Sequence, residues 1–227
     1  GDARLRGSAV VVGPDGLAYF TSGMDHQVLR QRADGQVELV AGAPRPGVNK
    51  IAEDTAATLA TLVDGMPAAE AQLSFPNGLA FGPDGALYVA EVLSMRILRI
   101  DGATGARPTV TRAAGISLVD LLAMPVETPV EAEGRLATDA GVITPTAVAV
   151  DPQGRLLWAE IGTTTATSLD ARLASDFKLP EGMRATYPRV RRRGKDGRVT
   201  TIAGPGGRFF QDPGAEDALV LPTAVAV

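Results

Sequence analysis

The sequence predicts an all-β protein built from repeated four-stranded antiparallel units. Three stretches, AVVVGPDGLAYF, GLAFGPDGALYV and AVAVDPQGRLLW, resemble one another. Their turn prolines recur every 69 residues, at Pro14, Pro83 and Pro152. Short apolar runs alternate with Pro-Asp-Gly and Asp-Gly turns, a pattern typical of β-hairpins. A fixed period of this kind indicates a repeat architecture.

Each unit is predicted to contain four strands in the same order. The first strands precede the proline turn and cover residues 9–12, 78–81 and 147–150. The turn then leads into second strands at 17–21, 86–91 and 156–160, because proline presets φ and glycine accepts a positive φ. The third strands alternate polar and apolar residues, as suits one buried face, at 27–31, 96–100 and 189–193. The fourth strands follow a further turn and end at a glycine, as in QVELVAG and RVTTIAG.

All the units belong to a single repeat region, residues 1–227. The first two stay in register well past the turn, since Tyr19 falls on Tyr88 and Arg30 on Arg99. We expect blades at 8–42, 76–115 and 145–204, and a partial unit at 222–227, which repeats PTAVAV of 145–150 letter for letter. The inserts between them are 43–75, 116–144 and 205–221. Each ends in an alanine-rich acidic stretch before a proline, where we expect a short turn of helix, and Asn49 is a candidate cap for a further one.

The composition excludes several kinds of site. The chain has 227 residues, 45% of them hydrophobic, which is enough to bury a core, and it contains no Cys and one His. Disulfides, cysteine-ligated zinc, iron–sulfur clusters and any site with two imidazoles are therefore excluded. The net charge of −4 disfavours nucleic acid and anionic lipid as partners. No apolar run reaches the 18 residues of a membrane span, and the amino end shows no signal-peptide pattern.

Tandem four-stranded meanders are the building unit of a β-propeller. The stretch PNGLAFGPDGALYVAEVLSMRILRID, preceded by DGMPAAEAQL, resembles the NHL repeat in the form found in bacterial and teneurin-like members. The three units depart from that pattern where Glu91, Glu160 and Ser22 replace the usual Asp. The resemblance implies an NHL-type propeller, a class that usually closes with six blades, whereas this chain has three and the first strand of a fourth. Two readings remain open: a piece of a longer propeller, or self-association that completes a six-blade ring.

Three residues are weak catalytic candidates. Glu91 and Glu160 end equivalent second strands, so they should project from the same face of adjacent blades. They could serve as acid and base or hold a hard cation, or they could pair with the arginine of the repeat. His26 lies between the second and third strands of the first unit and is either catalytic, as in several propeller lyases and lactonases, or a loop residue. With one His and no Cys, a Ca²⁺ or Zn²⁺ site would need carboxylates and backbone oxygens.

A basic run is the candidate binding surface. It lies in YPRVRRRGKDGR and comprises Arg189, Arg191, Arg192, Arg193, Lys195 and Arg198. On a hairpin this run would make a cationic patch suited to an acidic partner or an anionic polymer, or it would be a solvated edge that guards against sheet pairing. It carries few aromatic residues, so stacking on single-stranded nucleic acid has little support.

The sequence therefore predicts a non-catalytic binding scaffold, part of a larger protein, that presents inter-blade loops to a protein or glycan without a cofactor. The alternative is a propeller lyase or lactonase that uses Glu91, Glu160 and a bound cation such as Ca²⁺ or Zn²⁺. RNA binding by the basic run is a third, weaker option. The alanine-, arginine- and glycine-rich composition is typical of a high-GC bacterium. Bacteria of this kind often export such propellers, so we expect an extracellular or periplasmic location.

Overall fold

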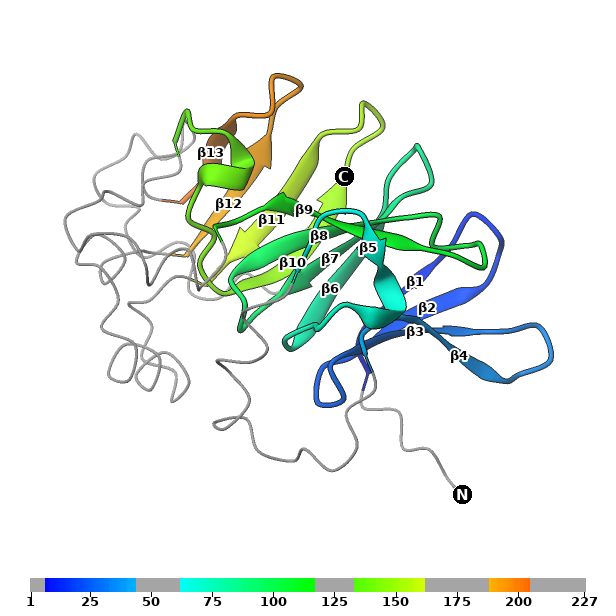
Figure 1. The fold of residues 1–227 in the computed structure, drawn as a ribbon. Helices are drawn as coiled ribbons and strands as arrows, with labels where there is room; N and C mark the ends of the chain where they lie inside the picture. Colours follow the sequence, from blue (N-terminus) through cyan, green and yellow to red (C-terminus); the bar gives the residue numbers. More distant parts are fainter. Residues whose placement is uncertain (1–6, 44–61, 117–132, 162–187, 205–227) are drawn as a thin grey trace.

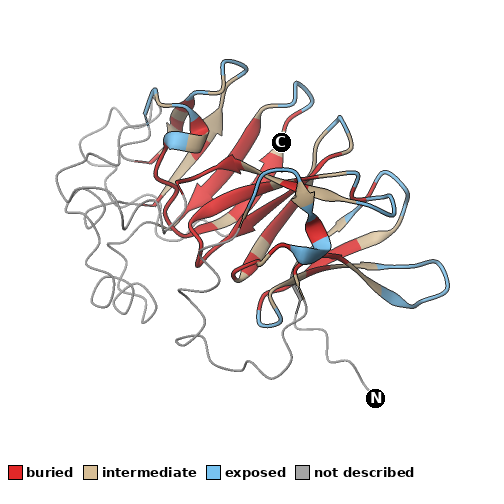
Figure 2. Cartoon of the chain, in the orientation of Figure 1, coloured by how far each residue is buried: buried red, intermediate tan, exposed pale blue. Residues whose placement is uncertain are grey.

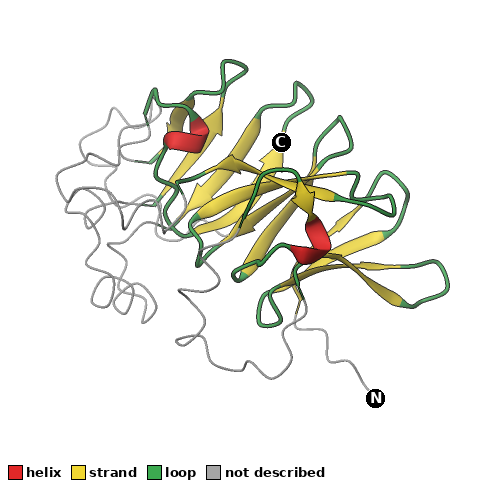
Figure 3. Cartoon of the chain, viewed as in Figure 1, coloured by secondary structure: helices red, strands yellow, loops and turns green. Residues whose placement is uncertain are grey.

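The structure, a computed structural model, describes residues 7–43, 62–116, 133–161 and 188–204 (Figure 1). These residues form three antiparallel sheets that follow one another along the chain, with two short 3₁₀ turns between them (Figure 3). The architecture is a partial β-propeller of three blades, as the 69-residue period predicts.

Blade 1 is a four-stranded meander. Its strands are β1 (Gly7–Val12), β2 (Ala18–Ser22), β3 (Gln27–Gln31) and β4 (Val37–Ala41). The proline turn between β1 and β2 is closed by the N–H of Gly16, which donates to the carbonyl of Gly13 at 2.9 Å, and Gly16 has φ 77°. The turn therefore uses the glycine for the positive φ expected from the sequence.

Blade 2 has the same meander and one additional short strand. Its strands are β6 (Pro76–Phe81), β7 (Leu87–Glu91), β8 (Arg96–Asp101) and β9 (Thr109–Ala114), with β5 (Met66–Pro67) on the outer edge. Within the insert 43–75, β5 pairs with β9 through Met66 and Val110. The sequence did not predict β5, because a two-residue strand has no periodicity of its own.

Blade 3 consists of β10 (Pro145–Val150), β11 (Leu156–Glu160), β12 (Arg189–Arg193) and β13 (Val199–Ala203). A pair of isolated bridges, from Glu133 to Val199 and from Leu136 to Arg198, repeats the pairing of β5 on this blade. An acidic side chain fastens the outer strand in both blades. Asp64 Oδ1 accepts the Arg112 N–H at 2.8 Å, and Glu133 Oε2 accepts the Thr201 N–H at 2.7 Å.

Short 3₁₀ turns lead the chain into blades 2 and 3, as the alanine-rich stretches predict. They are η1 (Ala68–Glu70) and η2 (Ala137–Asp139). Each turn is hydrogen-bonded to the end of the preceding blade: the Gly42 N–H donates to Ala68 O, and the Gly115 N–H donates to Ala137 O. The partial unit 222–227, the insert 205–221 and the Asn49 cap lie outside the described residues.

The core lies between the blades (Figure 2). One apolar cluster joins blades 1 and 2 and includes Tyr19, Val28, Val40, Leu79, Val89 and Leu98. A second cluster joins blades 2 and 3 and includes Tyr88, Ala90, Ile97, Val148, Leu156 and Trp158. Successive strand residues point to opposite faces, so β7 and β8 supply both clusters and are buried throughout most of their length. In the described ranges, no helix is long and apolar enough to cross a bilayer.

Candidate functional site

Glu91 ends β7 and is fully buried at 0% exposure. It lies directly opposite Arg96 on β8, and its Oε2 accepts a hydrogen bond from Arg96 Nε. Its Oε1 accepts the backbone N–H of Ser74 at 2.5 Å, and Arg96 Nη2 donates to Gln72 O at 3.2 Å. The pair therefore ties the β7–β8 hairpin to the chain that enters blade 2.

Glu160 occupies the equivalent place in blade 3, at the end of β11 and opposite Arg189. It is also 0% exposed, and its Oε1 accepts the Trp158 indole N–H at 2.6 Å. Two guanidinium groups lie near it: Arg189 Nε is 3.6 Å from Oε2, and Arg191 Nε is 3.6 Å from Oε1. The equivalence of Glu91 and Glu160 is thus structural, and each carboxylate contacts arginine.

These contacts limit what the two carboxylates can do. A general acid or base has to reach the proton that it transfers, directly or through one water molecule. Both carboxylates are enclosed and engaged by N–H donors. Across the part of the chain that the structure describes, no three His, Asp or Glu side chains gather where they could hold a metal ion.

His26 lies in the turn between β2 and β3 with a positive φ of 58°. Its Nδ1 accepts the backbone N–H of Phe75 at 2.9 Å. Phe75 precedes Pro76, the first residue of β6, so this contact links a turn of blade 1 to the start of blade 2. Met95 holds the equivalent turn position in blade 2, with φ 52°, and is 1% exposed. The shared geometry supports a structural place for His26.

The basic residues of 189–198 differ in how far they are exposed to solvent. Arg191 is 1% exposed, so it cannot belong to the surface patch expected from the sequence. Arg191 is the middle residue of β12, and it pairs with Trp158 of β11 on one side and with Thr201 of β13 on the other, so it lies at the centre of the sheet. Arg189, Arg192 and Arg193 are half-buried, and Lys195 and Arg198 are exposed. Arg198 Nη1 donates to Gly134 O at 2.6 Å.

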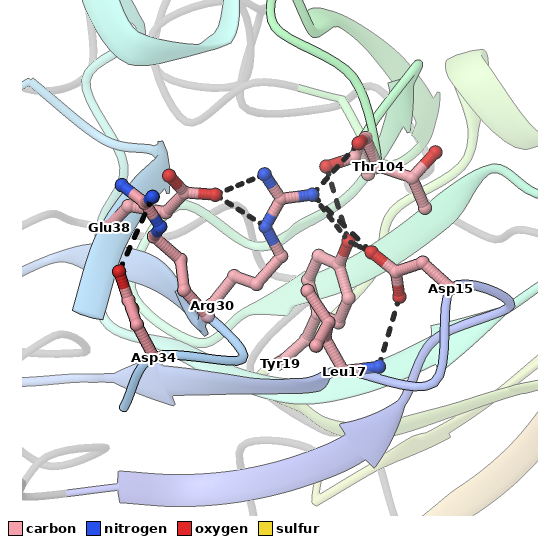
Figure 4. A network of polar contacts seen from close by, with 9 residues as sticks. Asp15, Leu17, Tyr19, Arg30, Asp34, Glu38 and Thr104 are labelled. Carbon is pink, nitrogen blue, oxygen red and sulfur yellow. Dashed lines mark hydrogen bonds and ion pairs between the residues drawn. The ribbon is translucent and has the colours of Figure 1, made fainter. Parts of the chain in front are cut away.

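A polar network lies at the seam of blades 1 and 2, where the two blades contact each other (Figure 4). It was not predicted from the sequence. Arg30 on β3 lies at its centre. Its Nη1 donates to Thr104 O at 2.9 Å and to the Tyr19 hydroxyl at 3.1 Å, and its Nε donates to Glu38 Oε1 at 2.6 Å. The Tyr19 hydroxyl in turn donates to Asp15 Oδ2 at 2.8 Å. The network therefore joins blade 1 to the β8–β9 turn of blade 2.

The network recurs in blade 2 and is lost in blade 3. Arg99 there donates to the Tyr88 hydroxyl and to Asp84 Oδ2, both at 2.7 Å. In blade 3 the register pairs Arg192 with Leu157 instead of a tyrosine. The recurrence of Asp, Tyr and Arg at the 69-residue spacing was a signal that could have identified this network from sequence.

The network also shifts the acidities of its members. Burial raises the pKa of Tyr19 above its ordinary value of 10.0. Burial alone would lower the pKa of Arg30, but its hydrogen bonds to Tyr19 and Glu38 raise it overall. Both residues therefore keep their neutral-pH forms, phenol and guanidinium, over a wider pH range.

A pocket of about 430 Å³ opens beside this network. Both blades line it, with Arg30, Glu38, Leu39, Val40, Ala69, Ala103, Thr104, Gly105, Ala106 and Pro108. The volume lies within the usual range for ligand pockets. Most of the lining is small and aliphatic, with one carboxylate and one guanidinium on the wall.

The chain is similar to known proteins over part of its length. No protein-family model matches it. It is 36% identical over 133 residues to Teneurin-m of Drosophila melanogaster. The aligned residues make up 58% of this chain and 4% of Teneurin-m. The chain thus spans a small fraction of this relative.

Solved structures of propeller type show weaker likeness. Virginiamycin B lyase from Staphylococcus aureus has 16% identity and a TM-score of 0.44, covering 90% of this chain and 43% of the lyase. A gluconolactonase from Xanthomonas campestris has 16% identity and a TM-score of 0.44, covering 83% of this chain and 43% of that chain. At 16% identity, the lyase and lactonase activities are properties of those two proteins and are not assigned to this chain. The 69-residue repeat, the four-stranded blades and the teneurin similarity together support a relation to propeller proteins of the NHL kind.

Proposed function

We propose that this chain is a non-catalytic interaction module, a teneurin-like NHL propeller segment that binds a partner polypeptide at the seam of blades 1 and 2. The observation that carries the proposal is the pocket of about 430 Å³ beside Arg30. Its walls come from two blades and from an inter-blade turn, the kind of segment that rigid scaffolds use for binding. The lining contains no aromatic platform for a sugar ring, so the proposal favours a protein over a glycan.

The polar groups of the pocket favour a donor on the incoming side chain. Glu38 Oε1 accepts both of its hydrogen bonds from Arg30, and the Glu38 side chain is 33% exposed. Among the described residues its second carboxylate oxygen receives no hydrogen bond, so it could accept one from an incoming N–H group. Ala69, Ala103 and Ala106 also line the pocket. A short aliphatic chain that ends in an amine or amide would satisfy both surfaces.

The charged residues elsewhere support a binding role over catalysis. Glu91 is enclosed and shares its carboxylate between Arg96 and a backbone N–H. Glu160 is enclosed by Trp158 and two arginines. The chain also matches only a short stretch of a much longer relative, which fits a module within a larger protein.

Selection from a displayed library of random peptides tests the proposal. Peptides chosen on the wild-type chain should lose binding to Ala106→Trp, because the indole fills the pocket. Gln153→Trp adds the same ring to an exposed turn of blade 3 and is the matched control. The proposal predicts loss of binding with the first variant only. Equal binding to both variants, or selection of no peptide, would overturn it.

A further inference from the structure

Several buried polar atoms of blade 3 have no hydrogen-bond partner among the described residues, whereas the equivalent ion pair of blade 2 is hydrogen-bonded. In blade 2, Glu91 and Arg96 bond to each other and to the entering chain. In blade 3, Glu160 Oε2 and Thr144 Oγ1 are buried and have no hydrogen-bond partner among the described residues. Arg191 Nε and Nη1 share this condition. Native proteins rarely leave such groups without water or an ion.

Arg191 is the unusual member of this group. Trp158 and Arg191 face each other across β11 and β12, in the register position that Val89 and Leu98 hold in blade 2. A guanidinium therefore stands where the repeat otherwise places a leucine. Its side chain is 2% exposed, and its only ion pair among the described residues is the 3.6 Å approach to Glu160 Oε1. That oxygen already accepts the Trp158 indole N–H.

Thr144 is a second buried hydroxyl donor, one residue before the strand that pairs with Glu160. It precedes Pro145, which pairs directly with Glu160. Its φ of 51° matches the 53° of Phe75, the equivalent residue before blade 2, so the backbone is conserved between the blades while the side chain changes from phenyl to hydroxyl. Thr144 is 3% exposed. The hydroxyl is thus placed inside the protein.

The positive charges near these donors favour an anion as the ligand. Glu160 lies 3.6 Å from two guanidinium groups, so Arg191 shares its counter-charge with Arg189. A buried guanidinium with unmade hydrogen bonds is costly, and the cost falls when an anion completes them. Full burial limits the anion to a small one. We infer that Arg191, with the Thr144 hydroxyl as a second donor, binds a small monovalent anion of the halide class inside blade 3.

Thermal unfolding at constant ionic strength tests this site without reference to the seam pocket. Replacing a large organic anion with chloride, from about 1 mM to about 100 mM, should raise the unfolding midpoint by about 3 °C, because a ligand of the native state stabilises it. Arg191→Leu restores the residue of blade 2, so it should fold and lose this chloride dependence. Thr144→Val, which keeps the shape, should weaken the dependence.

Arg32→Leu is the matched control, since this arginine is 54% exposed on blade 1. Its midpoint should keep the full response to chloride. A wild-type midpoint that ignores chloride, or a response that survives in Arg191→Leu, would overturn the inference. Crystals soaked in bromide provide a direct readout: an anomalous peak beside Arg191 supports the site, and ordered water there without bromide refutes it.

Discussion

Glu91 and Arg96 face each other across β7 and β8, and together they fasten this hairpin to the chain that enters blade 2. Both side chains are almost inaccessible to solvent, at 0% and 2% exposure. A buried ion pair of this kind depends on both partners, because either charge alone would remain buried and uncompensated.

Breaking this pair should therefore be strongly destabilising. Glu91→Gln and Arg96→Met are each expected to lower the free energy of unfolding by about 3–5 kcal/mol. The double variant Glu91→Gln/Arg96→Met should lose much less than the two single losses combined, since it leaves no unpaired charge. Urea unfolding monitored by circular dichroism measures the four proteins of this cycle. Additive losses would mean that the two side chains do not act as a pair.

Tyr19 should make the chain sensitive to alkaline pH. Burial raises its pKa above 10.0 in the folded state, so the folded chain holds the phenol proton more tightly than the unfolded chain. The resulting stabilisation is complete below pH 10 and is lost as the pH rises through the raised pKa. Unfolding followed between about pH 9 and pH 11.5 should show this decline.

Tyr19→Phe is the comparison for this pH profile. The variant loses the hydrogen bonds of the hydroxyl, which should cost about 1 kcal/mol at neutral pH. Its free energy of unfolding should fall less steeply above pH 10 than that of the wild-type chain. Identical alkaline slopes would assign the decline to other groups.

Asp84 should contribute stability with the opposite pH dependence. Burial would raise its pKa, but the hydrogen bonds from Arg99 and the Ala86 N–H lower it below the ordinary 3.8. The contribution is present above the unfolded pKa and is lost as the pH falls through the lowered folded pKa. Asp84→Asn should therefore be less stable than the wild-type chain at pH 7 and nearly equal to it near about pH 2. A constant difference over this range would contradict the assignment.

Gly115 is required by its backbone geometry. Its φ is 96°, and a Cβ there would lie 2.5 Å from Met95 O and 2.7 Å from Arg96 Cα. Gly115→Ala should destabilise the fold by about 1–3 kcal/mol from the backbone strain alone, and by more because of these contacts. Gly85→Ala is the matched control, since Gly85 has φ 78° but nothing within 4 Å of a Cβ. Equal losses in chemical denaturation would show that the contacts contribute nothing.

The repeat made the blades predictable from sequence, because strands and turns depend on local patterns. The third strand was placed correctly at Gln27–Gln31 and at Arg189–Arg193. The equivalence of Glu91 and Glu160 followed from the same period and is confirmed by their register. Each of these inferences needed only the spacing of residues along the chain.

The sites were less predictable, because they form where separate blades meet. The pocket needs Glu38 of β4 and Ala106 of the β8–β9 turn, which nothing in the sequence links. Arg191 belonged to a basic run that suggested a surface, and only the packing of β12 showed that it is buried. The pairing of Arg30 with Glu38 on the neighbouring strand likewise depended on register rather than on spacing.

We propose that binding, rather than chemistry at the buried carboxylates, is the role of this chain. Isothermal titration of a selected peptide against the wild-type chain, Ala106→Trp and Glu91→Gln/Arg96→Met separates these two roles. We predict that the pocket variant loses the heat of binding and that the folded double variant keeps the wild-type affinity. Binding that survives in Ala106→Trp and disappears in the folded double variant would show that the peptide does not occupy the pocket.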